Sequence, residues 1–194
     1  MRTDAAIALG AGLGAAATLL ALRLTRRAAG DDDDSDDDDV DEVSSEEDIA
    51  VDAGGIAARE ALGWTDDDAP LKMLLCVNSD LRDSNGKSVS MTKGKACAQC
   101  GHATLGAYRR ALTSASGRNV LRVWLRTGQM KIAVKVPSQD ELMALQAEAA
   151  RRGLVCCLIR DAGHTQIAPG SRTVLAIGPA PERYFSFTQH LKLL

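Results

Sequence analysis

The chain of 194 residues is long enough for one ordinary domain with appendages, and its formal net charge is −3. That total hides two opposite parts: 14 of the 26 acidic residues lie between residues 31 and 52, whereas residues 70–194 hold 18 Lys and Arg against 7 Asp and Glu, a balance of +11. So basic a domain favours RNA, DNA or anionic lipid as its partner. The five cysteines are odd in number and two are adjacent, which excludes an ordinary secreted disulfide framework and indicates a reducing compartment.

The N-terminal part of the chain predicts a membrane anchor followed by a spacer. Residues 5–22 contain no charge, and as a helix they would span about 27 Å, close to the thickness of a bilayer core. Three arginines follow directly, which favours an anchor over residues 1–27 with the rest of the chain in the cytosol. A cleaved secretory signal and a mitochondrial transit peptide are the alternatives. Residues 28–69 are expected to form an acidic disordered linker, with one short helix near its end.

Residues 70–194 predict an α/β domain, because apolar runs alternate with helical patterns. Four strands are expected, over residues 72–77, 131–136, 154–159 and 172–179. Residues 82–89 are predicted to be a polar loop, and three helices are expected over residues 93–113, 138–152 and 181–192. Ser138 and Glu141 have the spacing of a capping box, and Gly153 is expected to end that helix.

The helix predicted over residues 93–113 carries a C-x-x-C pair. At 100° per residue, one stripe of small side chains is expected to pack on the sheet: Ala96, Cys100, Ala103, Ala107 and Ala111. A structural zinc would need four ligands, and Cys156 and Cys157 would point to opposite faces of a strand. We therefore predict that Cys97 and Cys100 are packing residues and that the protein needs no metal and no cofactor.

Two polar groups could carry chemistry instead. Lys95, Gln99 and His102 share an arc beside the small stripe of the helix. Asp161 follows a predicted buried strand, where ligands of open α/β sheets usually bind, and Thr165 lies in the loop that Asp161 opens. A solvated helix face and a purely structural Asx-turn are the alternatives for these two groups.

Both groups fall in segments that resemble the type 2 peptidyl-tRNA hydrolases of archaea and eukaryotes. The resemblance covers residues 72–194 and rests on four blocks in order: "GKACAQCGHA", "MKIAVKVPSQDEL", "IRDAGHTQIAPGSRTVLAIGPAP" and "HLKLL". It implies a three-layer α/β/α fold with a small mixed sheet, four-stranded here, and hydrolysis of the ester between peptide and tRNA, which recycles tRNA from aborted translation. Members with an N-terminal anchor, some on the mitochondrial outer membrane, are similar to residues 1–69 in layout.

The resemblance also implies a set of site residues. It gives the catalytic candidates Lys95, Gln99, Asp161, Thr165 and His102, and also Thr173, which we place with the substrate-binding candidates. The other substrate-binding candidates come from their charge or their place in these segments: Lys93, His164, Gln166, Arg109 and Arg110. As a hypothesis, Asp161 orients or deprotonates the attacking water, Lys95 stabilises the developing negative charge, and Gln99 positions the substrate. Basic residues after the catalytic helix are expected to follow the tRNA backbone: Arg109, Arg110, Arg118, Arg122, Arg126 and Lys131.

Three positions depart from the family pattern. Residues 82–89 form an insertion, Thr92 stands where glycine is common, and His164 stands where Arg or Lys is common. Two other classes of function also stay open: a membrane-anchored interaction or signalling module of the same fold without turnover, and a thiol or metal protein built on the C-x-x-C pair. The expected location is the mitochondrial outer membrane with the domain facing the cytosol, with a soluble cytosolic form and a homodimer left open.

Overall fold

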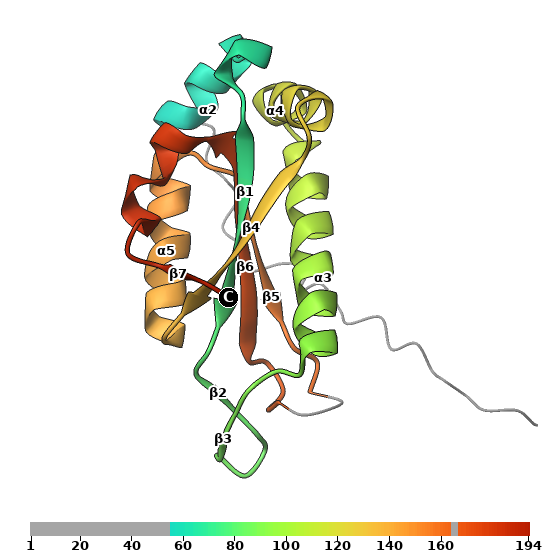
Figure 1. Ribbon diagram of the computed structural model, residues 1–194, viewed down its shortest axis with the longest axis vertical. Helices are drawn as coiled ribbons and strands as arrows, with labels where there is room; N and C mark the ends of the chain where they lie inside the picture. The colour runs from blue at the N-terminus through green and yellow to red at the C-terminus, as the bar shows by residue number, and fades with distance from the viewer. Residues whose placement is uncertain (1–54, 164–166) are drawn as a thin grey trace, which may run out of the picture. The chain divides into compact units, whose positions relative to one another are not determined.

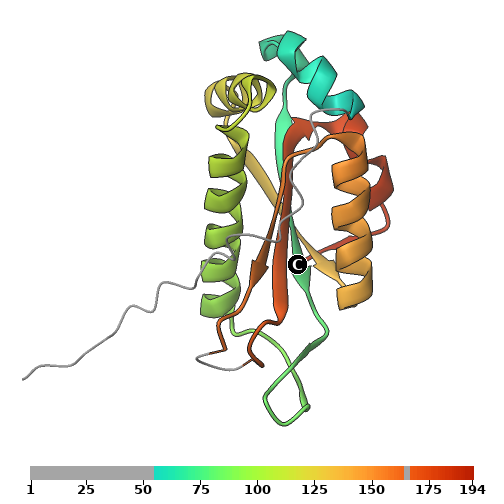
Figure 2. The ribbon, with the colours of Figure 1, turned by 180° about the vertical axis from the view of Figure 1, so that it is seen from behind.

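The computed structural model describes residues 55–163 and 167–194. The anchor predicted over residues 1–27 and most of the acidic linker therefore lie outside the described residues. The described part has a five-stranded mixed sheet with helices on both of its faces (Figures 1 and 2). Within this part of the chain, no helix combines the length and apolar character needed to cross a bilayer.

The sheet has the strand order β5-β6-β1-β4-β7. Its strands are β1 (Leu71–Asn78), β4 (Met130–Val136), β5 (Cys156–Arg160), β6 (Arg172–Pro181) and β7 (Lys192–Leu193). β1 pairs with β4 in parallel, and the β1–β6, β5–β6 and β4–β7 pairs are antiparallel. Because β5 and β1 run in the same direction, the carboxyl ends of β1, β4 and β5 meet at one edge of the sheet.

The prediction of a four-stranded sheet was wrong by one strand at the C-terminus. The expected last helix over residues 181–192 is instead the 3₁₀ helix η3 (Glu182–Thr188), followed by β7, which pairs with Val134 and Lys135 of β4. β7 has only two residues, both exposed, so it has no apolar alternation that a sequence pattern could reveal. The predicted polar loop over residues 82–89 also contains two short strands, β2 (Leu81–Arg82) and β3 (Ser88–Val89), which form a hairpin.

Helices α3 (Lys93–Ala111) and α4 (Ala115–Arg126) contact one face of the sheet, and α5 (Gln139–Arg152) lies on the other, as Figure 1 shows. Three short elements precede β1: α2 (Ile56–Glu60), η1 (Ala61–Gly63) and η2 (Asp66–Asp68). In α5 one half of the predicted capping box is present: the Ser138 hydroxyl accepts from the Glu141 amide at 3.1 Å, whereas the Glu141 carboxylate contacts His190 at 2.7 Å. Gly153 ends α5 with φ of +75°, which is a conformation that favours glycine.

Helix α4 is absent from the elements expected from the sequence. Its signal is nevertheless present, because Val120, Leu121, Val123 and Trp124 recur with helical spacing and are all buried. The hydroxyl of Ser114 accepts from the Gly117 amide at 3.0 Å and caps the helix.

The close packing of α3 on the sheet depends on small side chains. Ala103, Ala107 and Ala111 are buried as predicted, and they are joined by Gly106, where an added Cβ would lie 2.3 Å from the sulfur of Cys157 on β5. Cys100 is only half-buried, and Cys97 is exposed. The prediction that Cys97 is a packing residue was wrong, because Cys97 lies about 60° further round α3 than Cys100, which is itself at the edge of the buried stripe.

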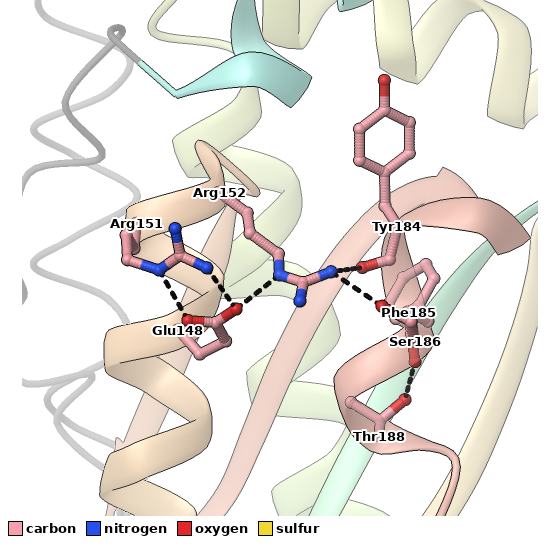
Figure 3. Close-up of polar contacts among 7 residues, drawn as sticks. All are labelled: Glu148, Arg151, Arg152, Tyr184, Phe185, Ser186 and Thr188. Atoms are coloured by element: carbon pink, nitrogen blue, oxygen red, sulfur yellow. Dashed lines mark hydrogen bonds and ion pairs between the residues drawn. The ribbon is translucent and has the colours of Figure 1, made fainter.

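Charged side chains of α5 bind the C-terminal 3₁₀ helix η3 (Figure 3). Glu148 accepts from the guanidinium groups of both Arg151 and Arg152, at 2.6–2.7 Å. Arg152 also donates to the backbone carbonyl of Tyr184 at 3.2 Å and to the hydroxyl of Ser186 at 3.0 Å. The two arginines hold the pKa of the Glu148 carboxyl down at about 2, chiefly through the Arg151 hydrogen bonds and then those of Arg152.

Candidate functional site

The candidate site lies where the first turns of α3 meet the edge of the sheet at which β5 ends and β6 begins. α3 supplies Lys95 and Gln99, the residue directly after β5 is Asp161, and β6 supplies Thr173. The hydroxyl of Thr92 caps α3 and accepts from the Lys95 amide at 3.3 Å. Four of the residues named from the sequence therefore come together from three separate elements.

A buried carboxylate is the centre of this group. Asp161 is only 2% exposed, and its Oδ2 forms an ion pair with the Lys95 ammonium. The same oxygen accepts from Gln99 Nε2 at 3.4 Å, and Oδ1 accepts from the Gly163 amide at 2.8 Å. A buried charge is tolerated when it is paired and hydrogen-bonded in this way, so the carboxylate and the ammonium hold each other in place.

The side-chain amide of Gln99 is held in one orientation by Thr173. Both residues are buried, and the Thr173 hydroxyl has Gln99 Oε1 at 2.6 Å and the Ile159 carbonyl at 3.3 Å. Since the hydroxyl has one proton, it donates to the nearer acceptor, Gln99 Oε1. The amide nitrogen of Gln99 then faces Asp161, which gives a chain of donors running from Thr173 through Gln99 to the carboxylate.

The loop after β5 closes on itself around Asp161. The Asp161 amide donates to the Ser171 carbonyl at 2.9 Å, and the Asp161 carbonyl accepts from the Gly170 amide at 2.8 Å. Gly163 has φ of +85°, and a Cβ there would come within 2.8 Å of Pro169. The bond from the Gly163 amide to Asp161 Oδ1 is the Asx-turn expected as a structural alternative. The other carboxylate oxygen of Asp161, Oδ2, nevertheless faces Lys95 on α3. His164, Thr165 and Gln166 lie outside the described residues.

The other predicted site residues that the structure describes lie outside the contacts of Asp161 given above. His102 is half-buried on α3, about 10 Å further along the helix axis than Lys95 at 1.5 Å per residue. Lys93 and Arg109 are exposed, whereas Arg110 is half-buried and donates to the Cys156 carbonyl on β5 at 2.8 Å. Four further basic residues make local contacts: Arg118 with the Leu112 carbonyl, Arg122 with Asn119, Arg126 with Asp66, and Lys131 with the Gln129 carbonyl.

One buried polar residue near the site was missed by the sequence analysis. Asn78 ends β1 and is 3% exposed. Its Nδ2 donates to the Arg172 carbonyl at 2.9 Å, and its Oδ1 accepts from the Asp80 amide at 2.9 Å. Asn78 thereby fastens β1 to β6 directly before Thr173. Asn78 could have been predicted from its side-chain amide, which directly follows a continuous apolar run.

The C-x-x-C pair lies away from Asp161. None of the five cysteines forms a disulfide. Cys100 lines an apolar cavity of about 460 Å³ together with Tyr108 and Trp124, on the flank of α3 opposite Lys95. Burial, and then the neighbouring Cys97, raise the pKa of the Cys100 thiol. Over residues 55–163 and 167–194, no three His, Cys, Asp or Glu side chains gather in an arrangement that could hold a metal ion.

The fold and the site together are suited to hydrolytic chemistry. An ammonium group held by a buried carboxylate can stabilise the negative charge that develops on a carbonyl oxygen when water attacks an ester. Lys95 is the most accessible member of the group, with 13% of its side chain exposed. These features define a mixed α/β domain with a buried polar group at the carboxyl edge of its sheet.

Comparison with known proteins gives the family. Residues 71–194 match the family model described as "Peptidyl-tRNA hydrolase PTH2", so the chain belongs to the PTH2 family of peptidyl-tRNA hydrolases. It is 44% identical to a "Probable peptidyl-tRNA hydrolase 2" of Drosophila melanogaster over 149 residues, 76% of this chain and 75% of that protein. It is 47% identical to "Peptidyl-tRNA hydrolase 2, mitochondrial" of Mus musculus over 123 residues, 63% of this chain and 62% of that protein.

The "Peptidyl-tRNA hydrolase" of Methanocaldococcus jannaschii is 42% identical over 125 residues, 64% of this chain and all of that protein. The similarity therefore runs from animals to archaea and reaches the whole length of an archaeal relative. The chain is a peptidyl-tRNA hydrolase, an enzyme that cleaves the ester between peptide and tRNA, and peptidyl-tRNA is its substrate.

Proposed function

We propose that Lys95, Asp161 and Gln99 carry the hydrolysis of peptidyl-tRNA. The observation that supports this most is the buried Asp161 carboxylate, which holds both the Lys95 ammonium and the Gln99 amide. Water attacks the carbonyl carbon of the ester, the bond to the terminal ribose oxygen breaks, and that oxygen takes up a proton. Peptide and tRNA leave as a free carboxylate and a free hydroxyl.

Each side chain has a distinct part in this proposal. Lys95 faces the carbonyl oxygen and stabilises its negative charge, since its ammonium is the accessible end of the group. Asp161 fixes the position of Lys95, since its own side chain is only 1% exposed. Its part in orienting the attacking water stays a prediction. Gln99 is 1% exposed, so it acts by holding the carboxylate rather than by contacting the peptide. Thr165 and His102 stay predictions as helpers of the water.

The proposal is tested by the release of peptide from N-acetyl-aminoacyl-tRNA. Lys95→Ala is expected to lower kcat by about 100-fold or more, and Lys95→Arg, which keeps the charge, is expected to restore part of the loss. Cys97→Ser on the same helix is the matched control, and it also tests the thiol alternative. Circular dichroism and thermal unfolding check the fold of each variant. Undiminished kcat in Lys95→Ala would refute the assignment, and loss of activity in Cys97→Ser would favour the thiol chemistry.

The RNA part of the substrate is expected to lie along the basic surface near α3. Lys93 and Arg109 are exposed and can reach phosphates, whereas Arg110 is held by the Cys156 carbonyl. His164, Gln166 and Thr173 stay proposed as substrate-side residues, with the buried Thr173 acting through Gln99.

A mitochondrial location, with residues 1–27 as the anchor and the domain facing the cytosol, is also part of the proposal. The relatives from Mus musculus, Homo sapiens and Bos taurus carry "mitochondrial" in their names. Alkaline extraction of membranes tests it: the full chain is expected in the membrane pellet, and a chain without residues 1–27 in the supernatant. The opposite partition would contradict the anchor. The homodimer stays a prediction that sedimentation of the purified protein would test.

A further inference from the structure

A short hairpin projects from the edge of the sheet that carries the candidate site. It consists of β2 and β3 and connects the end of β1 to the start of α3. Figure 1 shows it extending beyond the ends of β1 and β5, at the end of the domain where α3 begins. This segment corresponds to the insertion expected over residues 82–89, and none of the residue roles proposed above uses it.

The hairpin is internally well fixed. Leu81, at its base, is 2% exposed. Asp83 Oδ1 accepts from the amides of both Asn85 and Lys87 at 2.9 Å, and the Asp83 amide donates to the Lys87 carbonyl at 2.9 Å. Gly86 has φ of +78°, as the tight turn requires. A tip ordered before binding loses little conformational entropy when it contacts a ligand.

The hairpin is also tied to the loop that carries Asp161. The amide of Ala168 donates to the Arg82 carbonyl at 2.8 Å, and the Ser171 carbonyl, three residues further, accepts from the Asp161 amide. A ligand that contacts the hairpin is thereby held in a defined position relative to the candidate site.

The chemistry of the exposed tip favours nucleic acid over an apolar protein surface. No large hydrophobic side chain is exposed there. Its exposed side chains are all polar: Arg82, Ser84, Asn85, Lys87, Ser88 and Ser90. Lysine, serine and asparagine are among the side chains that contact phosphate and sugar. Arg82 pairs with Asp80 at 3.6 Å, whereas Lys87 has no ion-pair partner among the residues that the structure describes.

We propose that the β2–β3 hairpin is an arm that contacts the RNA part of the substrate, with Lys87 holding a backbone phosphate. This inference rests on the proposed function, because an ester at Lys95 and Asp161 requires the tRNA to lead away from the same edge of the domain. The arm adds one electrostatic contact that is independent of sequence, and it strengthens the binding of tRNA over that of short acceptor-end fragments.

The test uses the full chain and two substrates, N-acetyl-aminoacyl-tRNA and the same ester on a CCA trinucleotide. kcat/KM for each is measured over a series of salt concentrations in wild type, Lys87→Ala and Lys87→Glu. Arg59→Ala is the control, since Arg59 is an exposed cation on α2, at the opposite end of the domain in Figure 1.

Lys87→Ala is expected to lower kcat/KM for the tRNA substrate at low salt by roughly two- to fivefold, and Lys87→Glu by more. It should also reduce the slope of log kcat/KM against log salt by about 1, with a much smaller effect on the trinucleotide substrate and none in Arg59→Ala. An unchanged salt slope in Lys87→Ala, or an equal fall in kcat/KM for both substrates, would overturn the proposal that the hairpin contacts RNA. A wild type that releases no peptide would instead overturn the proposed function.

Discussion

The hydrogen bond from Thr173 to Gln99 gives a quantitative prediction about the site. Thr173→Val keeps the shape of the side chain but removes the proton that Gln99 Oε1 accepts at 2.6 Å. Because Gln99 is 1% exposed, water cannot readily replace that donor. The loss of a donor to a buried acceptor costs about 1–3 kcal/mol. The amide then keeps its bond to Asp161 but loses the one that fixes its oxygen.

That free energy sets the expected size of the effect. If it falls wholly on the transition state, kcat drops by about 5- to 150-fold, and any part absorbed by the folded state appears as a lower melting temperature. The assay is peptide release from N-acetyl-aminoacyl-tRNA, with kcat and KM measured separately. Thr173→Ser keeps the hydroxyl and is expected to recover most of the loss in kcat. If Thr173→Val retained wild-type kcat and stability, or if Thr173→Ser were no better than Thr173→Val, the positioning role would be refuted.

Three further predictions concern the packing that supports the site. Gly106→Ala is expected to destabilise the fold by about 1–3 kcal/mol, because its Cβ would lie 2.3 Å from the Cys157 sulfur. In thermal unfolding, the double variant with Cys157→Ala should recover much of the lost stability. No recovery in the double variant would contradict the contact. Arg110→Ala is expected to lower the free energy of unfolding by about 1 kcal/mol through the lost bond to the Cys156 carbonyl, and unaltered stability would argue against it. Glu148→Gln should destabilise by about 1 kcal/mol or less at neutral pH. The arginines lower the pKa of Glu148 in the folded state from 4.5 to about 2. The difference in stability between wild type and Glu148→Gln should therefore be complete above pH 4.5 and vanish as the pH falls through about 2. A stability difference that persists in acid would contradict this prediction.

Elements determined by neighbouring residues could be predicted from the sequence. Ser138 and Gly153 bound α5 because a cap needs only contacts within three or four residues. β1, β4 and β6 were found because each buries a continuous or alternating apolar run. β7 could not be found in this way, since its two exposed residues form a strand only because β4 offers an unpaired edge.

The candidate site was predictable in part for the same reason. The 100° spacing of a helix places Lys95 and Gln99 on one side of α3, and the end of a buried strand points to Asp161. The burial of Gln99 and its bond to Thr173 depend on a residue 74 positions away, which no local pattern reveals. The same limit explains Arg110, where the sequence predicts a cation for RNA and the structure has a guanidinium bound to the backbone of β5.

The most direct test of the account is the single-turnover rate of peptide release by Asp161→Asn, measured beside wild type with N-acetyl-aminoacyl-tRNA. This variant keeps the size of the side chain but removes the charge that holds Lys95. Asp140→Asn, an exposed carboxylate on α5, is the matched control. The account predicts a loss of about 100-fold or more in Asp161→Asn with the fold retained, and wild-type rates in the control. A rate for Asp161→Asn equal to that of wild type would contradict it.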